Sequence, residues 1–123
     1  MIQDNEFYNN TLYGTNQIWI DENATETITW TNNTFTNNII YNYSAHGDET
    51  AGQTYSYNTF FNSWQTLVGS NNNVNVDPAF ADLIDFVPTG TIEAPKLADV
   101  LIDKNTSLRQ NPTTMGAVKS ASE

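Results

Sequence analysis

The sequence contains no cysteine, only four basic residues and no long apolar run among its 123 residues. Without cysteine there is no disulfide framework and no thiolate for catalysis or metal binding. The 14 acidic residues outnumber the four basic ones, which are Lys96, Lys104, Arg109 and Lys119. The formal net charge is therefore -10. Because nucleic acids and anionic membranes are bound through clustered Lys and Arg, this balance argues against both. It suits neutral or cationic partners, or calcium.

Two targeting features are also missing. Residues 1–6, MIQDNE, have neither a basic n-region nor an apolar h-region, so we expect no secretory signal here. No apolar segment approaches the roughly 20 residues that span a bilayer, so we expect no membrane insertion. The length fits one domain or a piece of one.

Asparagine is abundant, with 18 residues, and most lie in or beside a repeat. Its copies are NNTLYGT (9–15), NNTFTNN (32–38) and YNTFFNS (57–63). Aligning Asn10, Asn33 and Asn58 gives spacings of 23 and 25 residues. The same alignment groups two columns of large side chains: Leu12, Phe35 and Phe60, and, further upstream, Phe7, Trp30 and Tyr55. A period in the twenties is typical of a solenoid.

The repeat is rich in β-branched and aromatic residues, as in TITWT (27–31) and TYSY (54–57), which favours strands over helices. Apolar triplets at 18–20 and 39–41 add a further strand to each winding. The sequence therefore predicts an all-β fold, a parallel β-helix of about three coils, at 5–26, 27–50 and 51–76. The triplet at 66–68 fits this pattern more loosely.

The asparagines have a physical role in this prediction. At a tight corner one residue must take φ > 0, which Asn tolerates well. Because coils stack about 4.8 Å apart, Asn10, Asn33 and Asn58 are expected to form a hydrogen-bonded structural ladder. Leu12, Phe35 and Phe60 are expected to point inward.

The segments NNTFTNNIIYNYS, SYNTFFN and NVDPAFAD resemble the closing coils of right-handed parallel β-helix proteins of the pectate-lyase-like superfamily. The Asp77–Pro78–Ala79–Phe80 and Gly116–Ala117 positions match the end of that pattern, whereas IEAPKLADVLIDKN departs from it. The resemblance covers residues 5 to 85 and implies a right-handed, single-stranded β-helix. It implies architecture and no particular substrate.

Two regions follow from this prediction: coils over 1–78, and an irregular tail over 79–123 that packs on or caps the last coil. Pro78 ends the repeat because it cannot donate to a ladder. Leu97, Val100 and Leu101 suit one short helical turn. Nothing precedes Phe7 to cover the first coil, so we expect a fragment of a longer parent that self-associates through this open coil.

Candidate site residues lie mainly in two insertions. Acidic side chains that are candidate calcium ligands are Asp21, Glu22, Asp48 and Glu49. They match no EF-hand, and solvated acidic loops are the competing interpretation. Aromatic candidates for stacking on sugar rings are Trp19, Tyr43 and Trp64. His46 fits a solvated loop better than a general base, because no second His completes a metal site.

No catalytic residue is predicted. The repeats contain no Lys or Arg to serve as the base of a lyase, and Asp21 with Asp48 is the single loosely plausible hydrolase pair. One hypothesis is therefore the non-catalytic C-terminal segment of a secreted bacterial polysaccharide lyase or glycoside hydrolase. The alternative is a non-enzymatic surface β-helix, adhesin-like or carbohydrate-binding. Both place the parent outside the cell or on its surface, with a polysaccharide partner.

Overall fold

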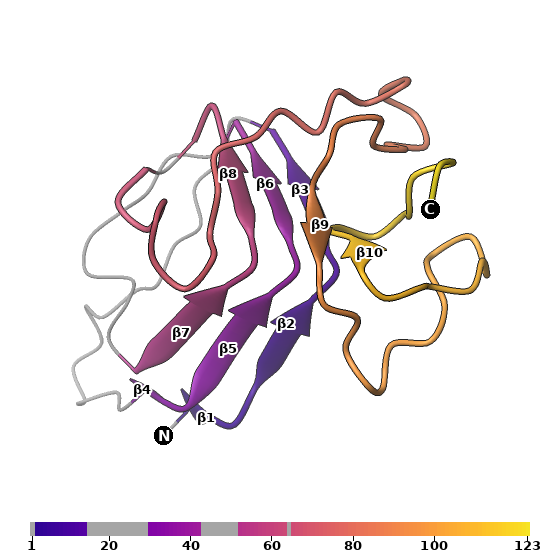
Figure 1. The fold of residues 1–123 in the computed structure, drawn as a ribbon. Coiled ribbons are helices and arrows are strands. Elements are labelled where there is room, and N and C mark those ends of the chain that lie inside the picture. Colours follow the sequence, from indigo (N-terminus) through magenta and orange to yellow (C-terminus); the bar gives the residue numbers. More distant parts are fainter. Residues whose placement is uncertain (1, 15–29, 43–51, 64) are drawn as a thin grey trace.

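The structure is a computed structural model that describes residues 2–14, 30–42, 52–63 and 65–123 (Figure 1). Within these ranges it has ten short strands and no helix. Their bounds are β1 Ile2–Gln3, β2 Glu6–Tyr8, β3 Thr11–Tyr13, β4 Trp30–Thr31, β5 Asn33–Thr36, β6 Ile39–Tyr41, β7 Gln53–Ser56, β8 Thr59–Phe61, β9 Glu93–Ala94 and β10 Thr113–Thr114. The predicted all-β class is confirmed.

The strands stack in parallel, one from each successive winding of the chain. One sheet has the order β2-β5-β7 and a second has the order β3-β6-β8, while β1 pairs with β4 (Figure 1). In the tail, β9 and β10 pair antiparallel, and two isolated antiparallel bridges join Phe80 to Pro88 and Ile102 to Leu108. Parallel neighbours separated by a full winding are consistent with a β-helix-like fold, as the repeat predicts.

The register differs from the predicted one. Phe7 pairs with Phe35, and Phe35 pairs with Tyr55. Phe35 therefore occupies the place between Phe7 and Tyr55 that was predicted for Trp30. Trp30 itself pairs with Ile2. Leu12 pairs with Ile40 and then Phe60, so Phe35 does not belong between them.

The misalignment has a simple cause. The string Asn-Asn-Thr at 32–34 copies the one at 9–11, but it lies at the preceding corner of the winding. The structural equivalent of Asn9-Asn10 is Asn37-Asn38, five residues later. Successive windings are thus offset by 28 and 20 residues because segments of different length join their strands.

An inner core fills the space between the two main sheets. It consists of buried Ile40, Tyr55 and Phe60, with Leu12 and Phe35 packed against them. The ring of Phe35 stacks between Phe7 and Tyr55, with centroid distances of 4.6 and 4.5 Å. Among the described residues, Phe35 is the one ring neighbour of Phe7, which remains 46% exposed.

The structure contains an Asn ladder, but its members differ from the predicted ones. They are Asn10, Asn38, Asn58 and Asn73. Each of the first three residues donates both its backbone N–H and its side-chain Nδ2 to Oδ1 of the following ladder residue, at 2.9 to 3.0 Å. The amides of Asn38, Asn58 and Asn73 also donate to carbonyl oxygens one winding back, those of Phe7, Phe35 and Tyr55. Asn33 lies at another corner, where it accepts from Asn5 at 2.8 and 3.2 Å.

The corner residues with φ > 0 stand one position before the ladder. They are Asn9, Asn37, Tyr57 and Asn72, with φ of 52°, 60°, 54° and 62°. The left-handed conformation was predicted for the ladder residues themselves, and this was wrong: the positive-φ residues of the described segments include none of Asn10, Asn33 and Asn58. Asn suits the ladder positions because its side-chain amide carries both a donor and an acceptor. In the buried ladder residues both groups are hydrogen-bonded.

The tail packs along the outside of the β3-β6-β8 sheet. Ile92, Ala94 and Met115 form a second core with Ile39 of β6. Gly116 approaches so closely that a Cβ there would lie 2.5 Å from the Ile39 side chain, and its φ is +91°, so only glycine fits. The tail therefore spans several windings instead of covering the last one alone, since Ala117 also donates to Thr11 at 3.1 Å.

Two buried or half-buried charges hold the end of the tail. Arg109 is 3% exposed, and its guanidinium donates to four oxygens, those of Thr113 (hydroxyl), Thr114, Gly116 and Ala117. Burial lowers its pKa, while the carboxylates of Glu123 and Asp103 oppose this shift. Burial alone would raise the pKa of Glu123, but hydrogen bonds led by the amides of Thr114 and Gln110 outweigh it and lower that pKa.

The lowered pKa of Glu123 predicts acid sensitivity of the tail. A carboxyl group whose folded-state pKa is depressed stabilises the fold fully above its unfolded value, here 4.5, and this stabilisation is lost as the pH falls through the lower folded-state value. We expect urea midpoints of the wild type and Glu123→Gln to differ at pH 7 and to converge as the pH falls well below 4.5. Glu93→Gln, at an exposed strand position, is the control. A constant difference at every pH would contradict this role.

The described residues include no helix long and apolar enough to cross a membrane.

Candidate functional site

The outward face of the β2-β5-β7 sheet carries polar side chains. Along β2, Glu6 and Tyr8 alternate with the inward-pointing Phe7, and along β5, Thr34 and Thr36 alternate with Phe35. Successive side chains of a strand point to opposite faces, so the core aromatics fix the direction of the polar ones. The register places Glu6 beside Thr34 and Tyr8 beside Thr36.

A loop of the tail stands opposite this face. Residues 97–100 form a tight turn in which the Val100 amide donates to the Leu97 carbonyl at 3.1 Å. A short helical turn was expected here, and the structure has a single reverse turn instead. Leu97 and Val100 are half-buried, and the Asp99 side chain is exposed.

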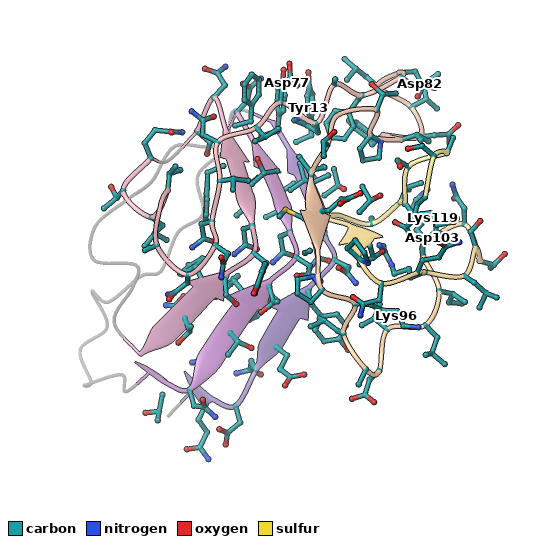
Figure 2. All side chains as sticks on the ribbon, viewed as in Figure 1. Tyr13, Asp77, Asp82, Lys96, Asp103 and Lys119 are labelled. Atoms are coloured by element: carbon teal, nitrogen blue, oxygen red, sulfur yellow. The ribbon has the colours of Figure 1, made fainter. Side chains whose placement is uncertain are left out.

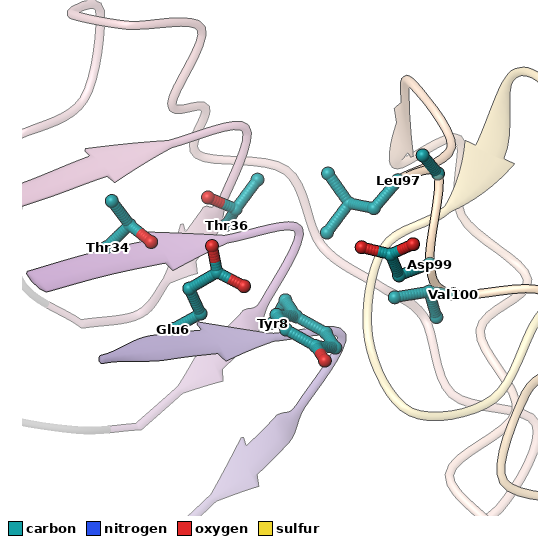
Figure 3. Close-up of a pocket in the computed structure, with 8 residues that line it drawn as sticks. Glu6, Tyr8, Thr34, Thr36, Leu97, Asp99 and Val100 are labelled. Atoms are coloured by element: carbon teal, nitrogen blue, oxygen red, sulfur yellow. The ribbon is translucent and has the colours of Figure 1, made fainter. Parts of the chain in front are cut away.

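The sheet face and the loop enclose a cleft of about 200 Å³, which we call the Tyr8 cleft. Its walls are Glu6, Tyr8, Thr34 and Thr36 on one side and residues 97–100 on the other. Figure 3 shows the carboxylates of Glu6 and Asp99 entering it from opposite walls. The volume lies below the ~300 Å³ at which pockets for drug-sized ligands begin, so the cleft encloses only a small part of any ligand.

The chemistry of the Tyr8 cleft combines a ring with hydrogen-bonding groups. The phenol ring of Tyr8, 39% exposed, offers an apolar face with a polar edge. Two carboxylates accept hydrogen bonds and two threonine hydroxyls both donate and accept. Its lining contains no Lys or Arg, so phosphate or sulfate groups have no cation to pair with here.

The site residues proposed from the sequence fall outside the described part of the chain. This holds for the aromatic candidates Trp19, Tyr43 and Trp64, for the calcium candidates Asp21, Glu22, Asp48 and Glu49, and for His46. Those assignments stay predictions. Among the described residues, no group of three or more His, Cys, Asp or Glu is placed to hold a metal ion.

Sequence reasoning missed every residue of the Tyr8 cleft. The signal was present in the strands: with the correct register, alternation alone directs Glu6, Tyr8, Thr34 and Thr36 outward together. The misaligned repeat instead matched Thr34 with Thr11, which belongs to a different sheet. For Asp99 no sequence signal existed, because its position depends on how the tail folds back.

Proximity in space, and not sequence order, thus defines the site. Glu6 and Asp99 are 93 positions apart in the chain, yet they line one cleft. Comparison with protein-family models, with curated proteins and with solved structures found no match to the chain.

Proposed function

We propose that this chain is a non-catalytic carbohydrate-binding segment of a secreted, carbohydrate-active β-helix protein. The observation that carries the proposal is the Tyr8 cleft, where an exposed phenol ring stands among carboxylates and hydroxyls. Sugar rings have apolar C–H faces that stack on aromatic rings, and equatorial hydroxyls that pair with carboxylates and hydroxyls. Both requirements are met within one small open cleft.

The architecture proposed with this function is a right-handed parallel β-helix of about three coils, of the pectate-lyase-like kind. Supporting it are the two parallel three-stranded sheets, the Asn ladder and the tail with its close-packed Gly116. The location proposed for the parent protein is outside the cell or on its surface, in a bacterium, where polysaccharides are accessible. Because a fold alone does not determine a function, the proposal of carbohydrate binding depends on the Tyr8 cleft.

Binding is tested by titration calorimetry of the purified chain with soluble oligosaccharides, neutral and acidic. We expect at least one to bind with a Kd below about 1 mM, as weak, open sites with few contacts do. The same mixtures are assayed for new reducing ends and for unsaturated products. Absence of binding to every saccharide at about 10 mM would overturn the proposal.

One observation favours a second candidate function, an inverting glycoside hydrolase. Glu6 and Asp99 face one cleft from opposite walls, as an acid and a base must. Turnover in the assay above that is abolished by both Glu6→Gln and Asp99→Asn would replace the binding proposal with this one. Turnover unaffected by both substitutions would exclude the pair.

Self-association through the first winding is also proposed. Its strands β2 and β3 carry the exposed side chains Phe7, Tyr8 and Tyr13, and edge strands of this kind pair readily with another chain. We expect the weight-average mass in sedimentation equilibrium to rise with concentration, and Phe7→Lys to reduce that rise. A monomer at every concentration would contradict the proposal.

A further inference from the structure

The polar face of the β2-β5-β7 sheet continues beyond the Tyr8 cleft. The register places Thr54 beside Thr34 and Ser56 beside Thr36, so two columns of polar side chains cross all three strands. The first column is Glu6, Thr34 and Thr54, and the second is Tyr8, Thr36 and Ser56. Four of these six residues line the cleft, whereas Thr54 and Ser56 lie outside it. The third winding therefore continues the polar surface past the tail loop.

The hydroxyl groups of this face are available to a ligand. Thr54 is exposed, and Thr34, Thr36 and Ser56 are half-buried. The described hydrogen bonds engage neither the Thr34 nor the Thr54 hydroxyl, and the hydroxyls of Thr36 and Ser56 share one long bond of 3.4 Å. Each hydroxyl can both donate and accept, as the hydroxyl groups of a sugar do.

The columns have a spacing that suits an extended chain of sugars. Neighbouring strands of a sheet lie about 4.8 Å apart, and the rings of Phe7, Phe35 and Tyr55 on the inner side repeat at 4.6 and 4.5 Å. This repeat is close to the advance of one pyranose unit in an extended glycan. A glycan that crosses the strands therefore meets a new pair of polar side chains at each unit, whereas along β5 it meets only Thr34 and Thr36.

The charges on this face favour a neutral glycan. Its six side chains include the carboxylate of Glu6 and no cation, and Asp99 adds a second carboxylate at the cleft. The four basic residues of the chain all belong to the tail, where Figure 2 shows Lys96 and Lys119. An acidic glycan would bring its carboxylates toward those of Glu6 and Asp99, on a chain whose formal charge is already -10.

We propose that a linear neutral glycan lies across β2, β5 and β7, with successive sugar units over the first, second and third windings. The first two units occupy the Tyr8 cleft, and the third lies on the surface of Thr54 and Ser56. This inference rests on the proposed function, to which it adds a third-winding subsite, the direction of the glycan and its chemical class.

The substitution Thr54→Val in the full chain tests the third-winding subsite. Valine keeps the β-branched shape that suits a strand and removes only the hydroxyl. The matched control is Thr91→Val, the same change at an exposed position of the tail. The neutral probes are cellobiose and cellotetraose and the corresponding xylan and mannan oligosaccharides, and the acidic probe is tetragalacturonate. A disaccharide fills the cleft alone, and a tetrasaccharide also reaches the third winding.

In titration calorimetry we expect a neutral tetrasaccharide to bind the wild type about tenfold more tightly than its disaccharide, because the third unit adds hydrogen bonds. Thr54→Val is expected to weaken binding of the tetrasaccharide about fivefold and to leave that of the disaccharide unchanged. Thr91→Val is expected to bind both like the wild type. The backbone amide resonances of Thr54 and Ser56 are expected to shift on saturation with the tetrasaccharide only.

Two results would overturn the third-winding subsite and leave the proposed function standing: equal affinity of the wild type for disaccharide and tetrasaccharide, or an unchanged tetrasaccharide affinity of Thr54→Val. Tighter binding of tetragalacturonate than of every neutral tetrasaccharide would overturn the neutral class. Absence of binding to every probe would overturn the inference together with the proposed function.

Discussion

Asn58→Ala is expected to lower the free energy of unfolding by about 3–5 kcal/mol. The side chain is fully buried and sits in the middle of the ladder. Its Oδ1 accepts both the backbone and the side-chain N–H of Asn38 at 2.9 Å, and its Nδ2 donates to Phe35 and Asn73. Alanine removes all four bonds and fills none of the space. Because domains are typically stable by only 5–15 kcal/mol, this single amide accounts for a large part of the fold's stability.

Urea denaturation followed by circular dichroism measures the effect, and hydrogen exchange locates it. The Ile39 amide, which donates to the Asn10 carbonyl across windings, is expected to lose protection. The control is Asn75→Ala, an exposed asparagine beyond the last ladder residue, with an expected change within about 0.5 kcal/mol. Equal effects of the two substitutions would show that the ladder does not hold the windings together.

Tyr8→Ala is expected to weaken glycan binding at least tenfold, corresponding to about 1.5–3 kcal/mol for a sugar face buried on an aromatic ring. Tyr8 is the aromatic residue that lines the Tyr8 cleft, so its ring is the stacking surface that the proposed function requires. Since the side chain is 39% exposed, the fold loses little packing.

Tyr8→Phe is the matched variant for this second prediction. It keeps the ring and removes only the hydroxyl, so we expect an affinity within about threefold of the wild type. Titration calorimetry with the tetrasaccharide that binds best provides both values. If Tyr8→Phe loses as much affinity as Tyr8→Ala, the hydroxyl and not ring stacking is responsible. If neither loses affinity, the glycan binds elsewhere on the protein.

The β-strands and the Asn ladder could be predicted from the sequence because both depend on local features. β-branched and aromatic triplets recur along the chain, and a stacked parallel arrangement allows the asparagines at its corners to pair with one another. The register could not be read the same way. Two Asn-Asn pairs, at 32–33 and 37–38, compete for the place opposite Asn9-Asn10, and identical letters favoured the wrong one.

The structure shows what decides between the two pairs. In the observed register Phe7, Phe35 and Tyr55 form one continuous ring stack and Leu12, Ile40 and Phe60 form one aliphatic-aromatic column. The rejected alignment would place Phe35 in the β3-β6-β8 sheet and turn the Asn38 amide away from Asn58. The continuous packing of these two columns thus outweighs the match of the Asn-Asn-Thr string.

The candidate site was beyond sequence reasoning for a different reason. Half of its lining comes from the tail, whose path follows from Ile92, Ala94 and Met115 packing on Ile39 and from Gly116 fitting where no side chain fits. Neither contact has a periodic signature.

The winding register is the claim on which the Tyr8 cleft depends, because it sets Tyr8 beside Thr36. Nuclear Overhauser contacts of the ladder side-chain amides test it directly. We predict that the Asn38 amide protons contact those of Asn10 and Asn58, while the Phe35 ring contacts Phe7 and Tyr55. Contacts of the Asn33 amide with Asn10 and Asn58 instead would contradict the account.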